Sequence, residues 1–336
     1  MKIGKTEIRQ GRAYIIADVG SNFNGSLDLA KAYIDAGKEI GVDAVKFQTY
    51  KAATLLNPLK PDGERWAAYD EVGKYELPWG WHQELFEHAE SVGIEFLTTP
   101  FDLSILDELQ RVGVRALKIA SGDLTFTLLL QKVAALGKPV ILSTGMADLE
   151  EIRAAVHTLR KGGAADIALL HCVSSYPPRF EQVNLRAMRS MADAFGLPVG
   201  LSDHTPGNAT ALGAVALGAL IIEKHITMDR QLGTPDALFA MTVAEFGRMV
   251  TDIRNLERAL GDGVKVPAED EREERTWARR GIYARVDIEA GGPLTMENVK
   301  FVRPENGVPA SEWSRFEGKV LRETLTKDRP LKRDYI

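Results

Sequence analysis

Short apolar runs alternate with longer amphipathic stretches along most of the chain. Eight runs occur, and each is followed by a polar cluster and a helical pattern. They span residues 14–19, 44–48, 94–99, 116–120, 139–143, 167–172, 198–201 and 220–222. Eight strand–helix units in about 260 residues match the size and rhythm of a (β/α)8 barrel, so an α/β barrel is predicted. An open, doubly wound sheet is the alternative, because the pattern alone does not show that the sheet closes.

Cap residues indicate where the predicted helices begin and end. Ser26 and Asn208 each precede a helical pattern as N-caps, and the capping-box spacing occurs twice, at 148–151 and 242–245. Glycines end several of these patterns, at Gly41, Gly93, Gly113, Gly137, Gly196 and Gly261. Residues 51–80 hold Pro58, Pro61 and Pro78 and are too long for a simple turn. We interpret this segment as a lid or an interface loop.

The residue pattern of the chain changes after Gly261. A Gly-Asp-Gly stretch, Pro267 and a charged run follow, and then short strands separated by turn signals. The pattern predicts a catalytic barrel over 1–262, a linker over 263–280 and a small β-rich module over 281–336. A module of this size is marginally stable alone, so it is expected to dock on another surface.

Composition narrows the class of partner. The net charge is −5 and no Lys/Arg-rich tract occurs, which argues against nucleic acid and against an anionic membrane surface and favours a small polar ligand. The N-terminus has no apolar signal-peptide region and no run approaches a membrane span, so a cytoplasmic protein is expected. The single cysteine, Cys172, lies in an apolar run and is predicted to be a buried, inert thiol.

A histidine follows each of the last two apolar runs, His204 after the first and His225 after the second. The carboxyl ends of parallel strands meet at one rim of the fold, so these two imidazoles can share a metal ion there. Asp203, Glu223 and Lys224 are expected at the same rim. The alternative is that both histidines are ordinary core residues with satisfied hydrogen bonds.

The other strand ends are also polar. Three lysines, Lys46, Lys118 and Lys224, occur among hydroxyl groups, and this combination predicts an anion site. Ser121 and Gly122 would add a hydroxyl and a close backbone N–H. The remaining polar strand-end residues are Asp18, Asn22, Gln48, Thr98, Thr99, Asp123, Ser143, Thr144, His171, Ser174, Tyr176 and Ser202. Neither glycine-rich nucleotide fingerprint is present, so a nucleotide is not expected.

Two chemistries suit this set of residues. In the first, a divalent metal such as Mn²⁺, held by the two histidines, polarises a carbonyl while a phosphorylated substrate binds the lysines. In the second, a strand-end lysine forms a Schiff base, as in a metal-independent aldolase.

Several motifs resemble the sialic acid synthase family in the family's own order. They are I-A-D-V-G-S-N-F-N-G-S (16–26), V-K-F-Q-T-Y (45–50), F-L-T-T-P-F-D (96–102), L-K-I-A-S-G-D (117–123), I-L-S-T-G-M (141–146), L-L-H-C-V-S-S-Y-P (169–177), G-L-S-D-H-T-P-G (200–207) and I-E-K-H-I-T (222–227). Residues 285–299 and 303–307 resemble that family's antifreeze-like (SAF) domain. The C-terminal module, residues 281–336, is charged and lacks a regular Thr or Ala face, which argues against ice binding.

The resemblance implies a transferase that condenses phosphoenolpyruvate with an open-chain N-acyl hexosamine and releases phosphate and a nine-carbon 2-keto acid. It implies Mn²⁺ or another divalent metal on His204 and His225, and a homodimer in which the small module of one subunit covers the barrel of the other. Carried over by position, the catalytic residues are Asp18, Lys46, Lys118, Asp123 and Tyr176. The substrate-binding residues are Gln48, Thr98, Ser121, Ser143, Ser174, Ser202, Asp236 and Arg303.

Four positions depart from the family pattern. The family has Glu where this chain has Asp18 and Asp123, His where it has Phe23, and a Gly-Pro-Asp-His run where it has G-T-P-D-A ending in Ala237. Each acid is one methylene shorter. The acceptor is left open between N-acetylmannosamine, its 6-phosphate and a 2,4-diacetamido sugar.

Overall fold

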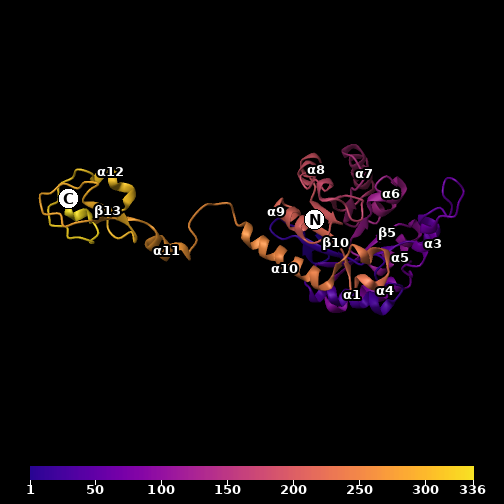
Figure 1. Cartoon of the computed structure of the whole chain (residues 1–336). Coiled ribbons are helices and arrows are strands. Elements are labelled where there is room, and N and C mark those ends of the chain that lie inside the picture. The colour runs from indigo at the N-terminus through magenta and orange to yellow at the C-terminus, as the bar shows by residue number, and fades with distance from the viewer. The chain divides into compact units, whose positions relative to one another are not determined.

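The computed structural model describes residues 1–336 as two compact units, Met1–Gly261 and Asp262–Ile336 (Figure 1). The central sheet of the first unit has eight parallel strands: β3 Tyr14–Asp18, β4 Ala44–Thr49, β5 Glu95–Pro100, β6 Leu117–Ile119, β7 Val140–Ser143, β8 Ile167–Cys172, β9 Val199–Asp203 and β10 Ile221–Thr227. Their order is β5-β4-β3-β10-β9-β8-β7-β6. Strand β3, the first of the eight in the chain, pairs with β10, the last, and β5 and β6 lie side by side. The prediction of a barrel is confirmed, and the open doubly wound sheet is excluded.

Eight main helices surround the strands (Figure 1): α1 Leu27–Glu39, α4 Trp81–Val92, α5 Leu106–Val112, α6 Thr127–Ala135, α7 Leu149–Gly162, α8 Ala187–Phe195, α9 Ala209–Ala216 and α10 Val243–Leu260. The Ser26 hydroxyl caps α1, and both predicted capping boxes are present, at Asp148 and Thr242. Asn208 stands at the start of α9, but its side chain makes no cap bond and instead donates to Asp252. Asn208 is therefore the N-cap residue of α9, as predicted, but it caps the helix without a side-chain hydrogen bond. No helix is both long and apolar enough to cross a bilayer.

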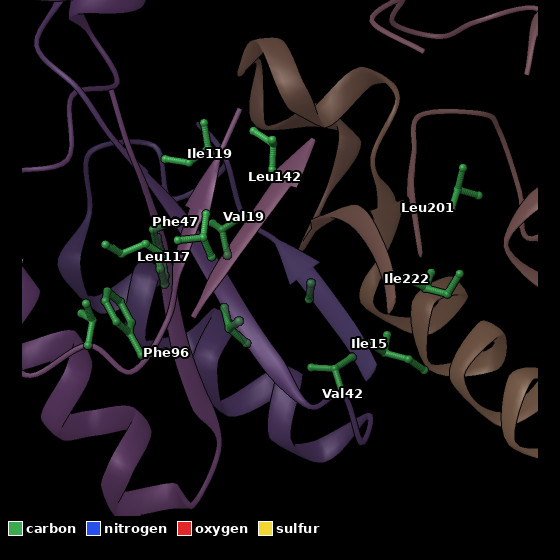
Figure 2. Close-up of a cluster of buried hydrophobic side chains, with 14 of the residues drawn as sticks. Ile15, Val19, Val42, Phe47, Phe96, Leu117, Ile119, Leu142, Leu201 and Ile222 are labelled. Carbon is green, nitrogen blue, oxygen red and sulfur yellow. The ribbon is translucent and has the colours of Figure 1, made fainter. Parts of the chain in front are cut away.

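Side chains alternate strictly between the two faces of the strands. The outward residues pack against the helices in one large core, part of which is shown in Figure 2, for example Ile15, Phe47 and Leu142. The inward residues of the lower barrel, such as Ile16, Leu97 and Ile141, form a second core. Farther along each strand the inward positions become polar. This period of two sends every second residue at the strand ends toward one central site.

A small hairpin closes the amino-terminal end of the barrel. Its strands are β1 Lys2–Ile3 and β2 Thr6–Glu7, which pair antiparallel. Ile3 and Ile8 pack with Tyr14 in the inner core, and all three side chains are buried. The interior below the polar layer is thus filled by side chains.

The segment 51–80 is more ordered than a loop. It contains α2 Ala52–Leu55 and α3 Ala67–Gly73, and a bridge joins Leu59 to Arg65. These helices are too short for an apolar period to be recognised, which is why the sequence did not predict them. The role of the segment as a lid or an interface stays a prediction.

The second unit begins with α11 Glu271–Ala278, which buries no side chain and lies within the stretch predicted as a linker. Strands β12 Gly281–Ala284 and β13 Val299–Val302 pair antiparallel, and α12 covers Trp313–Phe316. Ile282, Leu294 and Leu325 are among the residues of its own apolar core. The remaining short elements of the chain are β11 Met241–Thr242 and the 3₁₀ turns η1 Leu103–Ile105, η2 Ser121–Asp123, η3 Phe180–Gln182, η4 Arg230–Leu232, η5 Pro235–Leu238, η6 Ala310–Glu312 and η7 Arg333–Tyr335.

Candidate active site

A cavity of about 400 Å³ lies at the carboxyl ends of the barrel strands. Its lining is Asp18, Lys46, Gln48, Thr99, Phe101, Lys118, Ala120, Ser121, Gly122, Ser143, Met146, Cys172, Ser174, Tyr176, Ser202, His204, Glu223 and His225. Most of the residues predicted from the sequence are therefore brought together here. The strand parity described above explains the selection, since the lining residues within the strands face inward.

Asp18 links the lysine side of the cavity to the histidine side. Its Oδ2 lies 2.8 Å from Lys46 Nζ and 3.5 Å from His225 Nε2, and it accepts a hydrogen bond of 3.2 Å from Gln48 Nε2. Burial alone would raise the pKa of Asp18, but Lys46, His225 and these hydrogen bonds outweigh burial and lower the pKa to about 2. The same carboxylate helps to raise the pKa of Lys46 against its own burial. Both groups are therefore charged at neutral pH.

Lys118 belongs to a second charged cluster on the cavity floor. Its Nζ donates to Ser143 Oγ over 2.6 Å and lies 3.6 Å from Glu223 Oε1, which also accepts from Ser202 Oγ over 3.0 Å. Burial lowers the pKa of Lys118, and the Glu223 carboxylate opposes that shift. Glu223 Oε2 is buried without a hydrogen-bond partner. This floor can bind an anion through Lys118 and the two serines.

Three residues from neighbouring loops form a narrow hydroxyl-lined edge. The backbone N–H of Gly145 donates to Ser121 Oγ over 2.9 Å. A Cβ placed on Gly145 would lie only 2.3 Å from Ser174 Oγ and 2.9 Å from Ser121 Oγ. A side chain at this position would fill the space between the two hydroxyls, so the glycine keeps the edge open for a ligand.

The two histidines lie side by side, with ring centroids 5.5 Å apart. In the tautomer with a proton on Nδ1, His204 donates to the Val173 carbonyl over 3.3 Å, which leaves its Nε2 lone pair free. Burial, with a smaller effect of His225, lowers the pKa of His204 to about 4, so the ring is neutral at pH 7. His225 Nδ1 is buried without a partner. The free Nε2 lone pair of His204 and the unpartnered Nδ1 of His225, at one rim, are nitrogen groups of the type that binds a divalent transition metal such as Mn²⁺.

The protein supplies few ligands for such a metal. No group of three or more His, Cys, Asp or Glu side chains has a metal-binding arrangement. A metal on His204 and His225 would therefore take oxygen ligands from water or substrate, which is compatible with octahedral coordination.

Two aromatic rings stand over the histidines at the mouth. The Tyr176 ring centroid lies 4.3 Å from that of His204, and the Phe239 centroid lies 5.1 Å from that of His225. The two aromatic centroids are 5.2 Å apart. Burial raises the pKa of the Tyr176 hydroxyl, so this group stays protonated.

Lys224 does not join the anion site, contrary to expectation. Its strand position places it on the outer face, where Nζ lies 2.7 Å from Asp203 Oδ2 and donates to the Thr205 carbonyl. Asp203 faces the same way, so neither side chain lines the cavity. The site therefore has two lysines rather than three.

Thr98 also faces away from the cavity. Its hydroxyl is hydrogen-bonded to Thr49 over 2.7 Å, whereas Thr99, one residue later, lines the cavity and accepts from Lys46 over 3.4 Å. Interpreting Thr98 as a substrate-binding residue is therefore wrong by one strand position. The family motif contains both threonines, and only the parity of β5 distinguishes them.

Three other predicted residues lie outside the lining. Asp123 is half-buried with Oδ2 unpartnered, and burial raises its pKa to about 6. Asp236 accepts from the backbone N–H and the hydroxyl of Ser21. A Cβ on Gly20 would lie 2.2 Å from Asp236 Oδ2 and 3.2 Å from His225 Cε1, so Asp236 stands near the histidine without lining the cavity. Arg303 belongs to the second unit, so its role on the sugar stays a prediction.

Phe23 and Ala237, the other two residues that differ from the family pattern, are buried, and so is Cys172. Phe23 packs edge-on against Trp81 in the helix-side core, and Ala237 is fully buried. Neither residue lines the cavity. Cys172 is buried as predicted, and burial raises the pKa of its thiol, although the residue also lines the cavity floor.

Sequence reasoning missed three contributors to the site. They are Thr99 and Glu223, for which the sequence indicates a place at the strand ends but no role, and Gly145. Inward parity relative to Asp18, Lys46 and Lys118 would have identified the first two. Gly145 carries no signal of its own, because its role depends on the close approach of Ser121 and Ser174.

Together, the closed barrel and this cavity define a (β/α)8-barrel enzyme whose cavity holds lysines and serines beside a pair of histidines. The NeuB family model matches residues 33–265 and the SAF domain model matches residues 279–335. The chain belongs to the NeuB family and carries a SAF domain, so the expected family, fold and enzyme class are confirmed.

Named relatives agree with this assignment. N,N'-diacetyllegionaminic acid synthase of Legionella pneumophila is 42% identical over 96% of this chain and 94% of its own length. The Campylobacter jejuni enzyme of the same name is 40% identical over 94% and 98%. The crystal structure of N-acetylneuraminic acid synthetase from Leptospira borgpetersenii superposes with a TM-score of 0.75 at 36% identity, covering 82% of this chain and 94% of that one.

Proposed function

We propose that the protein condenses phosphoenolpyruvate with the open-chain aldehyde form of an N-acyl hexosamine, giving a nine-carbon 2-keto acid and inorganic phosphate. The observation that carries this proposal is the arrangement of one cavity. Lys46, Lys118 and the serines form an anion site on its floor, and His204 and His225 stand at its mouth. The names of the nonulosonic acid synthases among the relatives support the same reaction class.

In this reaction C3 of phosphoenolpyruvate bonds to the aldehyde carbon, and the aldehyde oxygen takes up a proton. Water adds to C2, and phosphate leaves with the oxygen that joined it to C2. Lys46 and Lys118 neutralise the phosphate and carboxylate of the substrate, and Ser121, Ser143, Ser174 and Ser202 orient it. Asp18 keeps Lys46 charged. Its carboxylate also faces Nε2 of His225 and so orients the imidazole ring.

A divalent metal on the two histidines, Mn²⁺ in this proposal, would polarise the aldehyde and orient water. The residues around it already hold the imidazoles in place, through Val173 for His204 and Asp18 for His225. Tyr176 and Phe239 shield the rings from solvent on the mouth side.

The test is phosphate release from phosphoenolpyruvate on addition of N-acetylmannosamine, its 6-phosphate or a 2,4-diacetamido-2,4,6-trideoxyhexose, with product masses measured in parallel. Chelator should abolish turnover, and Mn²⁺ should restore it. Release of no phosphate with any of the three acceptors would contradict the proposal.

The rival chemistry is a Schiff-base aldolase, and the lowered pKa of Lys118 gives it a specific candidate. Borohydride added during turnover would trap an adduct on Lys118 or Lys46 if this mechanism operated. We expect no adduct and full sensitivity to chelator.

A further inference from the structure

A second cavity, of about 600 Å³, adjoins the mouth of the active site. It is lined after β8 by Tyr176, after β9 by Pro206, and after β10 by Pro235, Leu238, Phe239 and Met241. Tyr176 lines both cavities, so they share a wall. We call this second cavity the side pocket.

The side pocket has an apolar character that the reaction itself does not need. Leu238 exposes 78% of its surface, although an aliphatic side chain usually gains by burial. Phe239 holds its ring against His225 on one side and lines the side pocket on the other. The apolar surface therefore begins one aromatic ring away from the histidines.

The one charged side chain in the lining is already paired. Arg230 makes a two-armed ion pair with Glu245, and its Nε donates to the Ala240 carbonyl over 3.2 Å. A phosphate entering the side pocket would thus meet no uncompensated cation in its lining. Such a pocket favours neutral groups with methyl or acyl substituents and disfavours an anion.

We propose that the side pocket binds the end of the acceptor sugar farthest from its aldehyde, and selects a neutral sugar whose distal carbons carry acylamino or deoxy groups over a 6-phosphorylated one. This inference rests on the proposed function and narrows its substrate class. With the aldehyde at His204 and His225, the open chain extends past Tyr176, which brings its distal carbons to the shared wall. Leu238 and Phe239 then act as specificity-determining residues.

The experiment compares kcat/KM for the three acceptors in the wild type and in Leu238→Ala. The wild type should favour the 2,4-diacetamido-2,4,6-trideoxyhexose and use the 6-phosphate least. Leu238→Ala should raise the KM for the diacetamido sugar about tenfold, the scale of a lost apolar contact, with the KM for phosphoenolpyruvate unchanged. Leu217→Ala is the matched control, because Leu217 is also exposed, at 57%, but follows α9 at the opposite end of the barrel.

A second variant tests the charge argument. Leu238→Lys places an unpaired cation at the rim of the side pocket and should shift the preference toward the 6-phosphate. A wild type that prefers the 6-phosphate, or a Leu238→Ala variant that changes all substrates equally or none, would overturn the inference. So would weakened subunit association with unchanged acceptor KM, since the side pocket would then be a protein contact. Turnover with any acceptor keeps these failures distinct from failure of the proposed function.

Discussion

Asp203 and Lys224 are paired across neighbouring strands, and each directly precedes one of the two histidines of the site. Their Cα positions are register partners of β9 and β10, and their charged atoms lie 2.7 Å apart in a fully buried setting. Asp203 also accepts from Thr205 and Thr210, and Lys224 donates to the Thr205 carbonyl. The pair therefore fixes the outer faces of the two strands while His204 and His225 point inward, so both residues position the imidazoles without touching substrate.

Replacing both partners should weaken metal binding. In Asp203→Asn/Lys224→Met no uncompensated charge is left in the core, and the hydrogen bonds that Thr205 donates to residue 203 can persist, whereas the one from Lys224 to the Thr205 carbonyl is lost. We expect the dissociation constant for Mn²⁺, measured by the EPR signal of free Mn²⁺, to rise about tenfold, because outer contacts orient the ligands. Arg254→Met, which breaks a separate ion pair with Asp43 at 3.0 Å, is the control. Equal Mn²⁺ affinity in both variants and the wild type would show that the Asp203–Lys224 pair is purely structural.

Lys118→Ala should raise the KM for phosphoenolpyruvate far more than the KM for the sugar. The substitution removes the charge-assisted contact on the cavity floor and leaves the mouth intact. Steady-state kinetics with each substrate varied in turn measures the difference. Lys138→Ala is a suitable control, because Lys138 donates only to the Val114 carbonyl outside the cavity. Equal changes in both KM values would count against the assignment.

Asp123 should make the protein less stable as the pH rises. Burial raises its pKa from 3.8 to about 6 in the folded state, so the folded state holds the proton more tightly than the unfolded chain. The penalty is absent below pH 3.8 and complete above pH 6. Asp123→Asn should therefore raise the free energy of unfolding at pH 7.5 by about 2 kcal/mol, after allowance for solvent access, and by less at pH 4.5. Urea titrations at both pH values measure this difference.

The exposed Asp270, which makes no cap hydrogen bond, provides the control for that experiment as Asp270→Asn. This variant should leave the free energy of unfolding unchanged at both pH values. A gain in Asp123→Asn that did not depend on pH would show that lost ionisation is not its cause.

Arg303 is predicted to reach the sugar across a two-fold interface. If so, inactive His225→Ala and inactive Arg303→Ala subunits should complement each other, because a hybrid dimer holds one intact barrel with one intact cap. Random reassortment makes half the dimers hybrid with one good site of two, so activity should recover to about a quarter of wild type. Mixing after verified subunit exchange with no recovery would exclude the cross-subunit role and leave the barrel chemistry unaffected.

The sequence predicted the barrel, the SAF domain and most of the cavity because each depends on local patterns. Asp18, Lys46 and Lys118 are polar residues within apolar runs, and such a run can be recognised without knowledge of the tertiary fold. The wrong predictions concern which face of a strand a side chain lies on. Thr98 and Lys224 stand one residue from cavity positions, and the apolar runs were too uniformly buried for their two faces to be distinguished.

Other features depend on contacts between segments far apart in the chain. Gly145 matters only because Ser121 and Ser174 converge on it, and Arg230 is unavailable to an anion only because Glu245 approaches it. Asn208 has the residue type and place of a cap, but Asp252 of α10 competes successfully for its side chain. No pattern within a single segment contains this information.

Because the β1–β2 hairpin closes the amino-terminal end of the barrel, substrates reach the cavity from the carboxyl ends of the strands. Lys46 and Lys118 lie at its back, each only 2% exposed, and Tyr176 stands at the entrance with 54% of its surface exposed. If phosphoenolpyruvate binds at the lysines and the sugar at the entrance, as proposed, a bound sugar would block the path to the lysines, so phosphoenolpyruvate would have to bind first and the keto acid would have to leave before phosphate. The kinetic mechanism should therefore be compulsory-ordered, with phosphate competing against phosphoenolpyruvate alone.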